Sequence, residues 1–245
     1  MFAQPKIIYQ DADLFAVTKP SGWLSIPDRH DPEIPSVKSW FEGRNEKVFI
    51  VHRIDKDTSG LLIMARNEEA HRHFNILFEQ RNLTKTYYGL VVGSIAEEEG
   101  VYDQPIEPHP IIQGRMRVGR KGKSAITHYQ VIDRFRGYTW VRFQIETGRT
   151  HQIRVHLQNA GHPLVCDPIY GNMDPVLLSA FKKKFKMSKE DLEERPLISR
   201  LALHAYSLEL VNRQNELFTI TAPLSKDLEA AIKQLSKWGS KGAGR

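Results

Sequence analysis

The sequence of 245 residues contains a single cysteine, Cys166. One thiol can form neither an internal disulfide nor a cysteine-based zinc site, which fits a reducing compartment. Long apolar runs are also missing, since no stretch approaches the ~20 residues that cross a bilayer. The opening segment "MFAQPKIIYQDADLF" lacks the apolar core of a signal peptide. We therefore expect a cytoplasmic protein that has no membrane partner.

Three common catalytic signatures are absent as well. "GRKGKSA" contains Gly-Lys-Ser, but Arg117 stands where a phosphate-binding P-loop needs its first glycine. No Gly-x-Ser-x-Gly elbow of a serine hydrolase occurs. His151 and His156 are five positions apart, whereas paired zinc ligands on one helix face are four apart. These absences argue against a P-loop enzyme and an elbow-type hydrolase, and we expect no bound metal.

Charge is only mildly unbalanced, with 35 basic and 29 acidic side chains and a formal charge of +6. That excess permits a polyanionic partner without requiring one. The segment "QGRMRVGRKGKSA" is more informative because five basic residues occur in it without an acid: Arg115, Arg117, Arg120, Lys121 and Lys123. It is typical either of a phosphate-binding loop or of a solvated hairpin loop, and both readings stay open.

The periodicity predicts an α+β fold in which hairpins dominate. Paired apolar runs predict three hairpins, at 6–20, 125–147 and 207–223, and Asn67 and Ser225 precede helical patterns. The regular βαβ alternation of a nucleotide-binding sheet is missing. We therefore expect a mixed, largely antiparallel sheet flanked by helices, in a single domain over 1–238 with a disordered tail at 239–245.

The loop "HRIDKDTSG" lies between two apolar runs and carries a candidate catalytic carboxylate, Asp55. Arg53 and Lys56 would favour its ionised form, and Gly60 permits an unusual backbone dihedral. An ordinary polar turn accounts for the same residues. Loops on a rigid scaffold nevertheless often present active-site groups.

A second candidate segment is "TGRTHQIRVHLQNAGH", which predicts a helix over 150–160. Ile153, Leu157 and Ala160 form its apolar stripe, and Arg154 lies at the border of that stripe. We expect Arg154 to be partly buried and to need an anionic partner. Arg149 stands at the helix start, where free backbone N–H groups attract anions. A solvated polar face is the alternative.

In combination these segments resemble one enzyme family, the RluA-type pseudouridine synthases. "HRIDKDTSGLLIMA" is similar to their His-Arg-Leu-Asp-x-x-Thr-Ser-Gly signature, with Ile54 in place of leucine. Further similar segments follow the family order over roughly 6–224: "KPSGW", "KTYYGLV", "ETGRTHQIRVHL", "DPIYG" and "RLALHAYSLEL". The resemblance implies a pseudouridine synthase-like catalytic domain.

The resemblance also implies a reaction, the isomerisation of uridine to pseudouridine in ribosomal or transfer RNA, which needs no cofactor. Asp55 would be the carboxylate at the sugar C1′ or C2′, and Arg154 would pair with it. Tyr87 would stack on the uracil ring, and Leu203 would line the pocket. Arg53 would fill the space that the extruded nucleotide leaves. No obligatory protein partner is evident.

Many relatives begin with a small RNA-binding domain of the S4 type, whereas "KPSG" here starts at residue 19. We therefore expect RNA docking to rest on the catalytic domain, with Arg117, Arg120, Lys121 and Arg149 as candidate contacts. Two alternatives remain: a non-catalytic RNA-binding module with the same fold, and a small-molecule hydrolase that uses His52 and Ser59.

Overall fold

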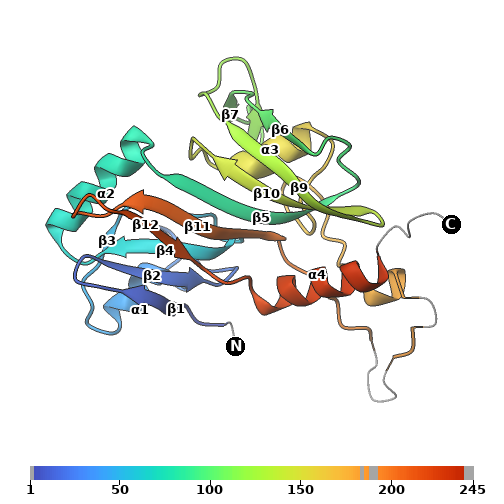
Figure 1. Cartoon of the computed structure of the whole chain (residues 1–245), viewed down its shortest axis with the longest axis horizontal. Helices are drawn as coiled ribbons and strands as arrows, with labels where there is room; N and C mark the ends of the chain where they lie inside the picture. Colours follow the sequence, from blue (N-terminus) through green and yellow to red (C-terminus); the bar gives the residue numbers. More distant parts are fainter. Residues whose placement is uncertain (1–2, 183–184, 188–192, 240–245) are drawn as a thin grey trace. The chain divides into compact units, whose positions relative to one another are not determined.

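The computed structural model describes residues 3–182, 185–187 and 193–239 (Figure 1). Contacts divide the chain into two compact units. The first contains 1–87, 144–147 and 203–223, and the second contains 88–143, 148–202 and 224–245. Within the described residues, no helix combines the length and the apolar character needed to span a bilayer.

The first unit contains a sheet whose strands follow the order β1-β2-β4-β11. Its strands are β1 (Lys6–Gln10), β2 (Leu14–Lys19), β3 (Phe49–Ile50), β4 (Ser59–Ala65), β11 (Leu203–Val211) and β12 (Leu217–Thr221). The pairs β1–β2, β2–β4, β3–β4 and β11–β12 are antiparallel, whereas β4 and β11 run parallel. The parallel pairing of β4 and β11 places the segment after Asp55 beside residues from near the end of the sequence.

Strand β4 is buried over its whole length because helices cover both of its faces. Leu61 and Ile63 pack in a cluster with Phe74 of helix α2 (Glu68–Gln80). Leu62 and Met64, which point the opposite way, pack with Phe41 of helix α1 (Val37–Glu42). A strand with two apolar faces reads as a continuous hydrophobic run, which is how "GLLIMA" looks in the sequence.

Both helices of the first unit begin at a capping side chain, and α2 begins where the sequence predicts. Ser36 caps α1 by accepting a hydrogen bond from the N–H of Ser39 at 3.1 Å. Asn67 caps α2 by accepting one from the N–H of Ala70 at 2.8 Å. Each side chain satisfies a backbone donor that the first turn leaves without a partner.

The second unit is built around a long hairpin of β9 (Thr127–Phe135) and β10 (Tyr138–Ile145), with β6 (Glu99–Tyr102) antiparallel to β9. Arg136 and Gly137 form the predicted turn, and Gly137 has a φ of 82°. Strand β5 (Thr84–Val92) begins in the first unit and ends in the second, and most of β10 lies in the second. Helix α4 (Lys226–Trp238) packs Leu228, Ala231 and Leu235 into the core of this unit.

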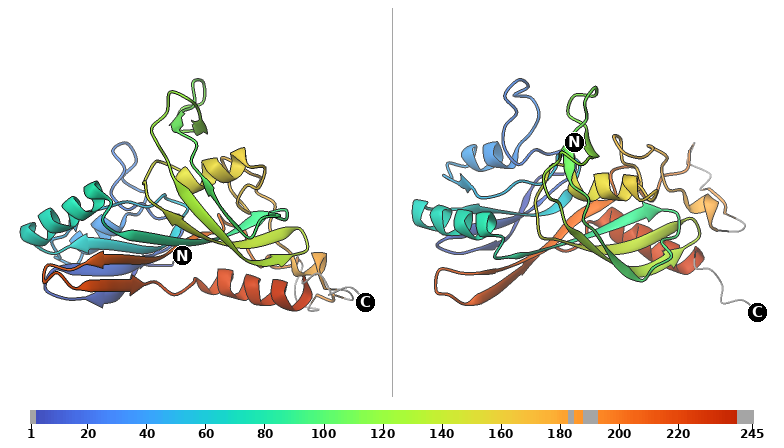
Figure 2. Two further views of the ribbon diagram at one scale, coloured as in Figure 1. Left: turned by 45° about the horizontal axis from the view of Figure 1, so that its top comes forward. Right: turned by 90° about the horizontal axis from the view of Figure 1, so that it is seen from above.

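A two-stranded sheet of β7 (Ile106–Pro108) and β8 (Met116–Val118) completes the second unit. The loop between these strands projects from its unit, as Figures 1 and 2 show. Ile111 in this loop is 87% exposed. Helix α3 (Gln152–Asn159) lies against this region. The basic segment of the sequence therefore forms β8 and the turn that follows it.

The predicted fold class is confirmed, because the sheets are largely antiparallel and helices flank them. The apolar run that precedes the "HRIDKDTSG" loop contributes only Phe49–Ile50 as β3. The remainder is the loop that carries Asp55. The single domain over 1–238 stays a prediction, and 240–245 of the predicted tail lie outside the described residues.

Candidate active site

The loop that carries Asp55 is anchored by a buried lysine of the first unit. The Nζ atom of Lys19 donates hydrogen bonds to the carbonyls of Pro20 at 3.0 Å, Trp23 at 2.7 Å and Lys56 at 2.8 Å. The Lys19 side chain is almost fully buried. Three carbonyl oxygens satisfy all three ammonium hydrogens, so the charge is tolerated in the interior. Lys19 thereby joins the "KPSGW" segment to the residue that follows Asp55.

Ser25 holds the other side of Asp55. Its hydroxyl donates to the carbonyl of Ile54 at 3.1 Å and accepts from the N–H of the same residue at 3.2 Å. The N–H of Gly22 also donates to the carbonyl of Lys56 at 2.9 Å. The residues on both sides of Asp55 are thus tied to the "KPSGW" segment and its continuation. A carboxylate on such a loop has a fixed backbone.

The residues that follow Asp55 serve to join two strands. Ser59 pairs in register with His204, and its Oγ lies 3.3 Å from the Leu203 carbonyl oxygen and 2.9 Å from Nδ1 of His204. Gly60 pairs with Ala205 and has a φ of 115°. A Cβ atom at Gly60 would lie 2.1 Å from the carbonyl oxygen of Ala205. Only glycine fits this close approach, as its unusual dihedral suggested.

The hydrolase alternative needs His52 and Ser59 to act together, but each forms its hydrogen bond with a different residue. His52 accepts a hydrogen bond from the N–H of Ile63 at Nε2, at 3.0 Å, and its ring stacks on Phe78 with centroids 4.7 Å apart. Burial, with a contribution from the charge of Lys85, lowers the pKa of His52 to about 3. The buried Ser59 hydroxyl bonds to His204 instead. The geometry therefore gives no support to that alternative.

Tyr87 of β5 is electrostatically coupled to Asp55 within the first unit. Burial, reinforced by the negative charge of Asp55, raises the pKa of Tyr87 well above its ordinary value. The phenol is therefore neutral at physiological pH and keeps its proton. Leu203 is buried at the start of β11, and Arg53 is exposed on the loop. The first unit thus contains four of the predicted site residues.

Arg154, on α3 of the second unit, is more deeply buried than predicted. It is 1% exposed, because all six residues from Gln152 to Leu157 are buried. The guanidinium binds Asp167 through two hydrogen bonds of 2.8 Å, from Nε and from one terminal nitrogen. It also lies 5.1 Å from the centre of the Tyr170 ring. The expectation of a half-buried arginine was therefore wrong, since the helix is covered on several sides.

Asp167, the buried partner of Arg154, was not among the residues predicted from the sequence. Burial alone would raise the pKa of Asp167. The hydrogen bonds and charge of Arg154, together with hydrogen bonds from the N–H groups of Ile169 and Tyr170, outweigh burial and lower this pKa. The carboxylate is therefore ionised and fixes the guanidinium plane. The signal was present in the sequence, because "DPIYG" contains Asp167 and a buried arginine requires an anion.

The basic residues of the second unit differ in how they are used. Arg117 pairs with Glu107 across the β7–β8 hairpin, with contacts of 2.7 and 3.0 Å. Arg120 and Lys121 are exposed in the turn that follows β8. Arg149 donates from Nε to the carbonyl of Ser124 at 3.0 Å. The acid that the basic segment lacks in sequence thus comes from the neighbouring strand.

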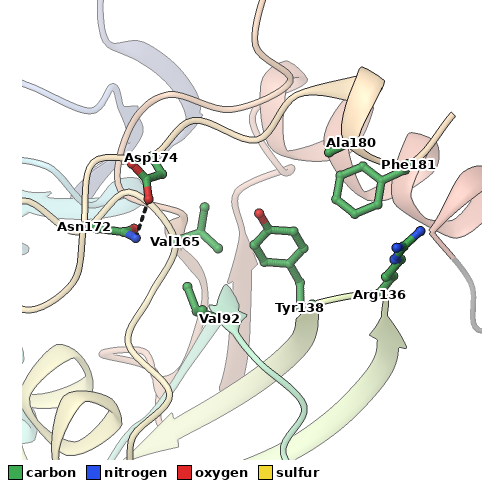
Figure 3. A pocket seen from close by; sticks show the side chains of 9 residues that line it. Val92, Arg136, Tyr138, Val165, Asn172, Asp174, Ala180 and Phe181 are labelled. Atoms are coloured by element: carbon green, nitrogen blue, oxygen red, sulfur yellow. Dashed lines mark hydrogen bonds between the residues drawn. The ribbon is translucent and has the colours of Figure 1, made fainter. Parts of the chain in front are cut away.

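A cavity of about 350 Å³ also lies in the second unit, and Figure 3 shows its lining. Tyr138, Phe181 and Arg136 contribute to its wall, and Asn172 donates to Asp174 at 2.7 Å. None of the predicted site residues lines it. The candidate active site is therefore assigned to the Asp55 loop.

The predicted residues divide between the two units. Asp55, Tyr87, Arg53 and Leu203 belong to the first. The others belong to the second: Arg154, Arg149, Arg117, Arg120 and Lys121. The expected pairing of Asp55 with Arg154 joins residues of different units and stays a prediction.

Residues 13–159 match the model of a family described as RNA pseudouridylate synthase. The chain belongs to this family. The matched region begins just before β2 and includes the whole Asp55 loop, β5 and α3. It therefore contains the anchoring contacts of Lys19 and Ser25 as well as Tyr87 and Arg154.

Individual pseudouridine synthases are similar over most of the chain. "Ribosomal large subunit pseudouridine synthase D" of Nitrosomonas europaea is 36% identical over 94% of this chain and 65% of its own length. The protein of that name from Haemophilus ducreyi is 34% identical over 94% of this chain and 70% of its own length. The chain thus spans about two thirds of the length of these relatives.

Solved structures of the family share the fold. Human RNA pseudouridylate synthase domain containing 1 is 26% identical, with a TM-score of 0.71 over 96% of this chain and 88% of that one. Human RNA pseudouridylate synthase domain containing 4 is 25% identical, with a TM-score of 0.69 over 94% of this chain and 92% of that one. The confirmed fold class is therefore that of a pseudouridylate synthase domain.

Proposed function

We propose that this chain isomerises uridine to pseudouridine within RNA, with Asp55 as the catalytic carboxylate. The observation that carries the proposal is the anchored Asp55 loop, in a chain that belongs to the pseudouridylate synthase family. In this reaction the C1′–N1 bond of uridine breaks, the uracil turns, and a C1′–C5 bond forms. Breaking a glycosidic bond builds positive charge on the sugar, which a nearby carboxylate stabilises.

The surrounding residues have distinct proposed roles. Arg154 is the proposed partner of Asp55, and Asp167 fixes its guanidinium through two hydrogen bonds. Tyr87 stacks on the uracil, and its raised pKa keeps the hydroxyl protonated, so it can donate a hydrogen bond. Leu203 lines the pocket, and Arg53 takes the place of the extruded nucleotide. No cofactor is required, because the reaction is an isomerisation.

The proposed substrate is ribosomal RNA of the large subunit, in the cytoplasm. Support comes from the names of the relatives, which are ribosomal large subunit pseudouridine synthases. Arg120, Lys121 and Arg149 are the proposed contacts to the RNA backbone, with Arg117 in a smaller role because Glu107 offsets its charge. Transfer RNA is the competing substrate class.

The decisive measurement is tritium release from RNA labelled at C5 of uridine, since C5 exchanges its hydrogen for the sugar bond. Large-subunit ribosomal RNA and transfer RNA transcripts serve as separate substrates. We expect release from ribosomal RNA by the wild type and background release by Asp55→Asn. RNA affinity should survive in that variant, because the change removes only a charge at the reacting sugar.

Asp57→Asn is the matched control, because it makes the same change two residues along the same loop. It should release tritium at the wild-type rate. Turnover by Asp55→Asn would contradict the assignment of Asp55. RNA binding by the wild type without tritium release from either substrate would instead identify a non-catalytic RNA-binding module.

A further inference from the structure

Lys85 on β5 is a mostly buried lysine whose ammonium group reaches solvent and has no partner among the described residues. Its side chain is 9% exposed. Across residues 3–182, 185–187 and 193–239, no hydrogen bond or ion pair to its ammonium group is found. Lys19 of the same unit shows the contrast, because it is more deeply buried, at 1% exposed, and bonds to three carbonyls. The ammonium group of Lys19 is thus satisfied by the protein, whereas that of Lys85 finds no partner in the described part of the chain.

The charged groups around Lys85 make its position less favourable. Burial, reinforced by the positive charge of Arg81, lowers the pKa of Lys85 to about 8. His52 also faces it, since the charge of Lys85 contributes to the low pKa of that imidazole. An ammonium group among basic neighbours, without an acid beside it, destabilises a folded protein. A lysine with this cost, and with no hydrogen-bond or ion-pair partner for its ammonium group among the described residues, is a candidate for binding an external anion.

Lys85 lies on the active-site face of its strand. Side chains two positions apart in a strand point to the same face, about 7 Å apart along the strand. Lys85 therefore shares a face with Tyr87, the residue coupled electrostatically to Asp55. That spacing is within the reach of one nucleotide held at Tyr87.

We propose that Lys85 binds a backbone phosphate of the RNA next to the uridine held by Asp55 and Tyr87. The inference rests on the proposed function. A phosphodiester is ionised at all physiological pH values and its oxygens accept hydrogen bonds from a compact point charge such as an ammonium group. A neutral uracil carbonyl would leave the buried charge without an opposite charge. The phosphate would therefore complete the site electrostatically.

The first test is binding of an eight-nucleotide RNA with one central uridine, measured by fluorescence anisotropy. Copies carry a neutral methylphosphonate at one linkage at a time. We expect Lys85→Met to weaken binding of the unmodified RNA about tenfold and to lower the slope of log affinity against log salt by about 0.7. A methylphosphonate beside the uridine should weaken wild-type binding similarly but should not further weaken the variant.

Lys38→Met is the matched control, because Lys38 is a partly exposed lysine of the first unit that pairs with Glu42. Its effect should add to that of every methylphosphonate. Additive losses for Lys85→Met at every linkage would overturn the proposal. So would an unchanged affinity of Lys85→Met for the unmodified RNA.

The second test separates a binding role from a structural one. Without RNA, Lys85→Met should raise the thermal unfolding midpoint, because it removes an uncompensated buried charge. A lysine kept for folding would lower the midpoint when replaced, and a lowered midpoint would overturn the proposal. Tritium release by the wild type tests the proposed function by itself. An active wild type with additive losses in the first test would defeat the Lys85 assignment alone.

Discussion

At the scale of single residues, the site is defined by how each buried charge is compensated. Lys19 bonds to three carbonyls, and Arg154 bonds to a carboxylate whose remaining acceptors take backbone N–H groups. Lys85 has no such partner among the described residues. Compensated charges hold the fold, whereas an uncompensated charge is available for a ligand.

His52 should make the protein less stable in acid. Its pKa is about 3 in the folded protein and 6.5 in the unfolded chain. Below pH 6.5 the unfolded chain therefore binds a proton that the native state does not, and stability falls as the pH falls. Between pH 7 and pH 5 the loss from this residue is about 2 kcal/mol.

Urea unfolding at the two pH values measures this loss. His52→Gln keeps a hydrogen-bond acceptor for Ile63 but does not titrate. The difference in its free energy of unfolding between pH 7 and pH 5 should therefore be about 2 kcal/mol smaller than in the wild type. His30→Gln, a change at an exposed histidine, is the control and should leave the pH dependence as it is. Equal pH dependence in wild type and His52→Gln would contradict the prediction.

At the scale of elements, the parallel contact of β4 with β11 places the Asp55 loop. Gly60 allows the strands to approach, and Ser59 bonds to the β11 residues Leu203 and His204. The β7–β8 hairpin is the second informative element, because Glu107 and Arg117 neutralise each other across it. The charge left for RNA is therefore carried by the turn after β8.

Gly60→Ala should be much more harmful than Gly137→Ala, although both glycines have a positive φ. Alanine at either site costs about 1 kcal/mol of backbone strain. At Gly60 the new Cβ would also lie 2.1 Å from a backbone oxygen, whereas no heavy atom lies within 4 Å of the Gly137 position. Denaturant unfolding should therefore show an additional loss of at least about 2 kcal/mol for Gly60→Ala. Equal losses of stability in the two variants would show that β4 and β11 can move apart at Gly60 with little cost in free energy.

The turn after β8 should supply the salt-dependent part of RNA binding. Arg120→Ala and Lys121→Ala should each lower the slope of log affinity against log salt by about 0.7 to 0.9, one phosphate contact each. Arg117→Ala is the matched comparison and should change the slope less, since Glu107 already holds that guanidinium. Titrations at several salt concentrations measure the slopes. The same slope in all three variants as in the wild type would exclude this turn from RNA contact.

At the scale of the whole molecule, the two units are not consecutive in sequence. The chain passes between them repeatedly, and β5 contributes residues to both. If 1–238 form one domain, unfolding either unit removes part of a strand from the other. We therefore expect one cooperative unfolding transition.

Tryptophan fluorescence can report on each unit separately. Trp40 belongs to the first unit and Trp140 to the second, so variants that keep only one of the chain's four tryptophans follow one unit each. For each variant, the urea midpoint is measured by fluorescence and by far-ultraviolet circular dichroism. The two midpoints of one variant should coincide. Two separated transitions in one variant would show that the units unfold as independent domains.

The sequence by itself determined the local structure and the family. Apolar periodicity predicted the hairpins, Asn67 predicted a helix start, and the "HRIDKDTSG" loop supplied Asp55 as the candidate carboxylate, because each of these signals lies within a few neighbouring residues. The tertiary structure decided which charges are paired. Lys19 meets the Lys56 carbonyl 37 residues away, and Ser59 meets Leu203 144 residues away. Such partners are brought together by packing, which no short stretch of sequence encodes. For the same reason the sequence could not distinguish Lys85, which has no partner among the described residues, from Lys19, which has three.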